Sequence, residues 1–143
     1  MRTPPAQVRI LIADELDPAA LEFLRGQGFE PEIATGLSEA SLCAKIRGVH
    51  ALVVRSATKV TRAVIEAADV LELVGRAGVG VANVDCEAAT EGGVIVMNTP
   101  EGNTVTTAEL AIALLVALAR HVPLADRRAR AGSWSKKGLM GSE

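Results

Sequence analysis

Short apolar runs alternate with stretches whose apolar residues recur at helical spacing, from the N-terminal end to about residue 98. Several of these runs have consecutive apolar residues without alternation, which is typical of parallel strands covered on both faces. The five runs that we predict as strands are residues 8–13, 30–34, 51–55, 73–76 and 94–98.

The stretches between these runs begin with residues that favour helix starts. Asp17 precedes Pro18, which suits a first helical position because its missing N–H would have no partner there. Five strands in strict alternation with helices indicate a doubly wound α/β fold, and the lack of an opening glycine fingerprint favours the flavodoxin-like parallel strand order 2-1-3-4-5. The residues that can cap the four predicted helices are Asp17, Ser38, Thr61 and Asp85.

The pattern changes after residue 98. Thr99 precedes a proline, which disfavours helix at that position and marks a break. Thr106 and Glu109 have the spacing of a capping box, and residues 108–119 are otherwise all apolar, so the helix that they form must be covered all round. We therefore predict a flavodoxin-like domain over residues 1–98. Residues 99–143 are predicted to hold a hinge, a long interface helix from Thr106 to Arg120 and a basic tail.

Composition and charge exclude several classes of function. Lys and Arg number 15 and Asp and Glu 17, so no basic field attracts nucleic acid, and no cationic amphipathic stretch suits a membrane surface. The two cysteines, Cys43 and Cys86, have no CxxC partner and are expected to be reduced thiols. The longest apolar run has ten residues, below the roughly 20 that span a bilayer, and the N-terminal run is too short for a signal peptide. We expect a cytoplasmic protein without nucleic-acid or membrane partners.

Arg55 and Arg76 end the third and fourth predicted strands. Because ligands of such folds bind beyond the carboxyl ends of the strands, both guanidinium groups are candidates to bind a carboxylate or a phosphate. Ser56 and Thr58 add hydroxyl groups. The alternative is that Arg55 is a solvated residue paired with an acidic side chain of the next helix.

The segment from Gly75 to Gly80 follows the fourth strand and is rich in glycine. Gly78 and Gly80 permit a close backbone approach, so their N–H groups and that of Val79 can form an anion-binding nest, a plain tight turn being the alternative. Read from Gly78, the segment is one residue short of G-x-G-x-x-G, but it does not follow the first strand and has no acidic residue near position 98. We therefore predict no dinucleotide site.

With residues 98–104, these elements suit a small, doubly anionic, hydroxylated ligand. They contain neither a nucleophile with a base nor a metal-ligand cluster. His50 and His121 are expected to be structural, so we predict no catalytic residue and no metal ligand.

Three linked motifs carry a family resemblance. Residues 53–61 (VVRSATKVT), 74–85 (VGRAGVGVANVD) and 96–103 (VMNTPEGN) strongly resemble D-3-phosphoglycerate dehydrogenases, which are D-isomer-specific 2-hydroxyacid dehydrogenases. The resemblance extends over most of the chain. It implies a flavodoxin-like substrate domain and the NAD-dependent oxidation of a 2-hydroxyacid in serine biosynthesis.

The resemblance also implies roles for individual residues. Arg55 and Arg76 would hold the phosphate and carboxylate of the substrate, assisted by Ser56, the amides of Gly78 and Val79, and Asn103. In the family the NAD-binding fold and the catalytic Arg, Glu and His follow the position of residue 143, and a helix from further downstream completes the substrate domain. We therefore expect a truncated fragment without cofactor, inactive alone.

The sequence departs from the family pattern at two places, and the resemblance also implies a subunit interface. Ala82 stands where the family usually has Asp, and the basic cluster after Trp134 is reduced to Lys136 and Lys137. The apolar helix lies at a subunit interface in the family. We therefore expect a homodimer through this helix, and exchange of the helix between subunits is an alternative because the hinge before it is flexible.

Three other functions are alternatives for a fold of this kind. A receiver domain of a signalling protein would use Asp14 in an acidic pocket, but it needs an aspartate where Arg55 stands and a lysine after the fifth strand. A flavin carrier would need aromatic residues at the carboxyl edge, and Phe23, Phe29 and Trp134 are elsewhere. A noncatalytic folding unit is compatible with the family resemblance.

Overall fold

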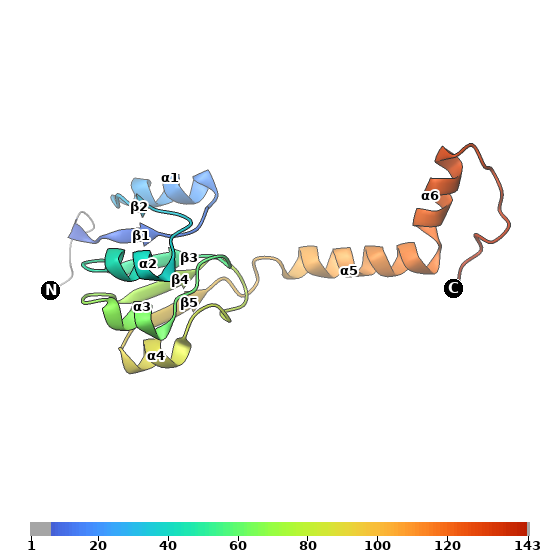
Figure 1. The fold of residues 1–143 in the computed structure, drawn as a ribbon. Helices are drawn as coiled ribbons and strands as arrows, with labels where there is room; N and C mark the ends of the chain where they lie inside the picture. Colours follow the sequence, from blue (N-terminus) through green and yellow to red (C-terminus); the bar gives the residue numbers. More distant parts are fainter. Residues whose placement is uncertain (1–6, 143) are drawn as a thin grey trace. The chain divides into compact units, whose positions relative to one another are not determined.

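The computed structural model describes residues 7–142 and divides into two compact units, the first ending at Gly102 and the second beginning at Asn103 (Figure 1). The first unit contains a five-stranded parallel sheet in the order β2-β1-β3-β4-β5, which confirms the predicted flavodoxin-like topology. Its strands are β1 (Ile10–Ile12), β2 (Glu32–Ile33), β3 (Ala51–Val54), β4 (Leu73–Arg76) and β5 (Ile95–Asn98).

Four helices connect the strands: α1 (Pro18–Gly26), α2 (Glu39–Lys45), α3 (Arg62–Ala67) and α4 (Cys86–Glu91). Three of the four predicted caps are confirmed, because Asp17, Ser38 and Asp85 each accept a hydrogen bond from a backbone N–H of the first turn. Thr61 is at the N-cap of α3 as predicted, but it makes no side-chain cap bond. Its hydroxyl is buried and meets no hydrogen-bond partner among the described residues.

One face of the sheet carries the core. The pairing register aligns one residue from each of four strands in a row on this face, where α2, α3 and α4 pack against it. Crossovers between parallel strands are right-handed, so the steps from β2 to β3, β4 and β5, all in one direction, place these three helices together. The row consists of Leu11, Leu52, Val74 and Val96.

The opposite face is covered only in part. The step from β1 to β2 runs in the other direction, so its crossover helix α1, drawn beside these strands in Figure 1, lies on this face. Ile10 and Ile12 of β1 are buried, whereas Ile95 and Met97 of β5 are 62% and 58% exposed within the first unit. Within the first unit this face is therefore open at β5, because α1 does not reach across the sheet.

The second unit consists of α5 (Thr104–Ala119) and α6 (Val122–Arg130). The predicted capping box is wrong: the helix begins two residues before Thr106, with Asn103 at its N-cap and no side-chain cap bond. Thr106 and Glu109 are thus inside the helix, since the preceding residues already adopt helical geometry. His121 separates the two helices with a left-handed φ of 53°.

Helix α5 has no buried residue within its own unit, and its Leu, Ile and Val side chains are exposed around the axis. The tail after α6 folds back, and Ser142 N–H donates to the Ala119 carbonyl at 2.9 Å. Among the described residues no single helix is long and apolar enough to cross a membrane. Helices α5 and α6 reach that length and apolar composition only when they are taken together, and the pair is bent by 64° at its break.

The unequal covering of the two faces predicts unequal costs of truncation. Leu52→Ala removes a side chain that is 0% exposed, and it should lower the free energy of unfolding by about 2–5 kcal/mol. Ile95→Ala, on the opposite and more exposed face, should lower the free energy of unfolding by only about 0.5 kcal/mol. Urea unfolding followed by circular dichroism compares the two variants. Equal losses would show that the face at β5 is covered in solution.

Candidate functional site

The two arginines singled out from the sequence both lie at the carboxyl edge of the sheet, because β3 and β4 are parallel neighbours. Arg76 pairs with Val54, so it lies on the core face of the sheet, where α2, α3 and α4 pack. Arg55 is the next residue after Val54. The two side chains line different hollows, of about 500 Å³ at Arg55 and 630 Å³ at Arg76.

The backbone at Arg55 is held by Asp14, which directly follows β1. The Asp14 carboxylate accepts hydrogen bonds from Arg55 N–H at 2.6 Å, from Thr58 N–H at 3.1 Å and from the Thr58 hydroxyl at 2.7 Å. The Arg55 guanidinium donates to the Glu15 carbonyl at 3.3 Å. Arg55 is exposed, as the alternative of a solvated residue predicts. The acidic residues suggested as its partners contact other groups, Glu66 lying 4.0 Å from Arg62 and Asp69 accepting from Gly48 N–H.

Asp14 is only 6% exposed. Burial raises the pKa of its carboxyl, but the hydrogen bonds from the Thr58 side chain and from the backbone N–H groups of Arg55, Thr58 and Ala57 outweigh burial and hold the pKa below its ordinary value. The carboxylate is therefore ionised at neutral pH and directed at the loop that carries Arg55.

Asn83 joins this loop to the loop after β4. Its side-chain amide donates to the carbonyls of Arg55 and Thr58, both at 2.7 Å. Its own backbone carbonyl accepts from Val60 N–H at 2.8 Å, and Val60 forms an isolated parallel bridge with Val84. The two loops that carry the candidate anion-binding residues are thus bonded to each other.

Gly78 lies beneath the Arg76 side chain. A Cβ atom at Gly78 would be 1.9 Å from Nη1 of Arg76, so any larger residue would displace the guanidinium. The Gly78 N–H donates to the Arg76 carbonyl at 2.9 Å, and the Asn98 side-chain amide donates to the Val79 carbonyl at 2.6 Å. The glycine therefore serves the placement of Arg76.

The remaining predicted residues are distributed differently. Ser56 lines the same hollow as Arg76, together with Lys59. The Thr58 hydroxyl was predicted as a possible ligand contact. It is buried and donates to Asp14 and to the Ala13 carbonyl, so it stabilises the loop. Asn103 belongs to the second unit, where it is the N-cap of α5.

Sequence reasoning missed the supporting roles of Asp14 and Asn83. Asp14 has a recognisable signal, an acidic residue directly after the first strand at the edge where ligands bind. Asn83 sits among small residues after the glycine-rich turn, and its spacing gives no sign that its amide reaches the other loop.

The glycine-rich segment does not fit a dinucleotide. A dinucleotide phosphate group needs a glycine turn that leads directly into a helix, but α4 begins only at Cys86. The space above Gly78 is taken by the Arg76 guanidinium. Within residues 7–142, no group of three or more His, Cys, Asp or Glu side chains could hold a metal ion.

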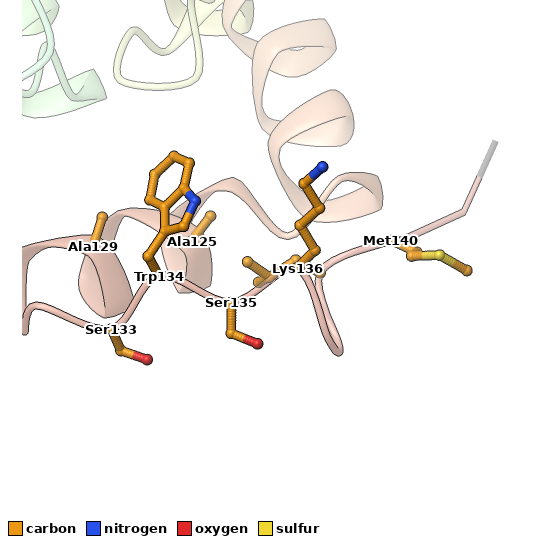
Figure 2. Close-up of a pocket in the computed structure, with 8 residues that line it drawn as sticks. Ala125, Ala129, Ser133, Trp134, Ser135, Lys136 and Met140 are labelled. Carbon is orange, nitrogen blue, oxygen red and sulfur yellow. The ribbon is translucent and has the colours of Figure 1, made fainter.

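A third hollow, of about 340 Å³, lies within the second unit (Figure 2). Its lining is mostly apolar, from Ala125 and Ala129 of α6 to Trp134 and Met140 of the tail, with Lys136 at its border. Trp134 is 90% exposed. This hollow offers no acid–base pair and contains none of the residues predicted to bind substrate.

Comparison with known proteins identifies the family. Residues 10–138 match the family described as D-isomer specific 2-hydroxyacid dehydrogenase, catalytic domain. The chain is 46% identical to the D-3-phosphoglycerate dehydrogenases of Archaeoglobus fulgidus and Homo sapiens, over 95% and 94% of its length. It spans about a quarter of these relatives, 26% and 25% of their respective lengths.

Solved structures agree. The TT0316 protein from Thermus thermophilus superposes with a TM-score of 0.80 at 35% identity, covering 94% of this chain and 45% of that protein. The NAD+-bound 3-phosphoglycerate dehydrogenase of Entamoeba histolytica gives 0.70 at 28% identity, covering 80% and 40%. The chain therefore belongs to the D-isomer-specific 2-hydroxyacid dehydrogenase family, and its fold is the five-stranded α/β unit that precedes α5.

Proposed function

We propose that the chain supplies the substrate-binding part of a D-3-phosphoglycerate dehydrogenase and binds a small phosphorylated 2-hydroxyacid. The observation that carries this proposal is the placement of Arg55 and Arg76 at the same edge of the sheet, on loops bonded to each other through Asn83. Such an edge is where ligands of doubly wound folds bind. The named relatives support the choice of substrate.

The charges suit such a ligand. A phosphorylated hydroxyacid carries a phosphate and a carboxylate at its two ends, and a guanidinium offers each of them paired N–H donors. Arg55 and Arg76 line separate hollows, so each can receive one anionic group. Ser56 and the amide of Val79 lie on the same two loops and complete the proposed contacts. The family resemblance adds Asn103 to the proposed substrate-binding residues.

Removal of the two arginines should strongly weaken anion binding. Each charge-assisted contact contributes about 1.5–3 kcal/mol, so 3-phosphoglycerate should bind the unmodified chain in the millimolar range. Arg55→Ala with Arg76→Ala should weaken binding more than about tenfold. A titration followed by amide chemical shifts of residues 55–58 and 76–80 measures this.

Arg47→Ala is the matched control. Arg47 precedes the amino end of β3, so this substitution removes a charge of the same sign from the opposite edge of the sheet. Equal binding by the control and the double variant would show that net charge, and not this edge, attracts the ligand.

The oxidation itself should be absent from these 143 residues. Hydride transfer needs a dinucleotide site and a proton acceptor, and neither the glycine-rich segment nor the arginine edge provides them. NAD and 3-phosphoglycerate incubated with the chain should give no nicotinamide absorbance above a blank. Turnover that persists after repurification would contradict this expectation.

We also propose that the chain is a homodimer through α5. Its Leu114 and Leu118, one turn apart, are exposed within the second unit, and covering such a side chain contributes about 1.5–3 kcal/mol. Two copies of the helix can cover each other in a twofold arrangement, the commonest in homodimers, with helix exchange as one form of it.

Light scattering at micromolar concentration should therefore report twice the mass of one chain. Leu114→Lys with Leu118→Lys should give monomers or aggregates. Glu109→Lys also introduces a lysine into the same helix, but it replaces a charged side chain and removes no apolar one, so this variant should remain dimeric. A compact monomer of the unmodified chain would exclude the dimer.

A further inference from the structure

The peptide groups of Arg55 are fixed on both sides by side chains from other loops. We propose that Asp14 is a positioning residue, which holds the loop of Arg55 in its anion-binding conformation while Asn83 transmits the same constraint to the loop of Arg76. The inference rests on the proposed function only for the identity of the ligand.

The Asp14 contacts are specific to this loop. Both of its oxygens are engaged, one by the N–H groups of Arg55 and Thr58 and the other by the Thr58 hydroxyl. A buried, ionised carboxylate strengthens each of these bonds, since hydrogen bonds to charged groups are stronger than neutral ones. Asp14 thus determines where the chain leaves β3 and where the Arg55 side chain starts.

A role of Asp14 as a ligand contact is disfavoured by the same geometry. A carboxylate facing an anionic ligand would repel it, whereas Asp14 is buried and satisfied by neutral donors of the protein. It therefore acts through Arg55 and has no contact with substrate to make.

Asn83 extends the constraint to the second arginine. Its amide spans the carbonyls at both ends of the loop from Arg55 to Thr58, and Asp85 N–H donates to the Val60 carbonyl at 2.9 Å. A shift of one loop would break bonds to the other, so the spacing of the two backbone segments that carry the arginines is set before a ligand arrives. Preorganisation of this kind lowers the cost of binding.

The test compares Asp14→Asn with Asp69→Asn in the full chain. Asp69 is the matched control, because its carboxylate also accepts a hydrogen bond from a backbone N–H, that of Gly48 at 2.6 Å. Gly48 precedes the amino end of β3, so this bond is at the opposite edge of the sheet from Arg55. Two quantities are measured for each variant: amide hydrogen exchange at Arg55 and Thr58, and the dissociation constant for 3-phosphoglycerate from a shift titration. Urea unfolding reports stability separately.

Asp14→Asn should speed exchange at Arg55 and Thr58 and weaken 3-phosphoglycerate binding about tenfold, as loss of a supporting shell commonly does. Asp69→Asn should leave both quantities unchanged. If Asp14→Asn binds as tightly as the unmodified chain, or if Asp69→Asn weakens binding equally, the positioning role is refuted. If the unmodified chain itself binds no 3-phosphoglycerate, the proposed function fails, whereas hydrogen exchange at Arg55 and Thr58 still decides whether Asp14 holds the loop. The two failures are therefore distinguishable.

A second pair of variants covers the case in which Asp14→Asn does not fold. Thr58→Val removes the hydroxyl that donates to Asp14 while keeping the shape of the side chain, and Thr58→Ser retains the hydroxyl. Binding should weaken in Thr58→Val and be largely restored in Thr58→Ser. Equal binding by the two would contradict the positioning role, because a purely steric contribution of Thr58 does not depend on its hydroxyl.

Discussion

The parallel pairing of β3 with β4 is the constraint on which the site depends. Because parallel strands end at the same edge, the pairing of Val54 with Arg76 brings the ends of two strands together although they are distant in sequence. The same register places Arg76 on the core face of the sheet, while Arg55 lines a separate hollow. A slip of one residue would exchange the faces of the whole strand, so the buried row of Leu52 and Val74 also fixes the position of the guanidinium groups.

The fold was predictable because its signals are local or strictly periodic. Apolar runs identified all five strands. Their alternation with helices, together with the lack of a glycine fingerprint after the first strand, favoured the observed order. The beginning of α5 was not predictable from the capping pattern. Thr106 and Glu109 have the right spacing, but a capping box requires an extended residue at its start, and the chain is already helical from Thr104.

The candidate site was predictable only in its outer part. Arg55, Ser56 and Arg76 are candidates because they lie at or directly after the end of a strand, and ligands of such folds bind beyond the carboxyl ends of the strands. The contacts that hold them are not local. Asp14 is 41 residues from Arg55 and Asn83 is 28, so the pairing of these groups follows from tertiary structure and leaves no spacing in the sequence.

An acidic residue beside two arginines that are proposed to bind an anion is tolerated for a physical reason. Asp14 loses most of its hydration on burial, but donors of the loop replace the water, so its charge is balanced by fixed N–H and O–H dipoles. Those same donors are then unavailable to the ligand, which leaves the guanidinium groups as the attractive part of the site. Neutral donors of the loop thus stabilise the Asp14 carboxylate. The carboxylate in turn fixes the backbone of Arg55, whose guanidinium is proposed to bind the anion.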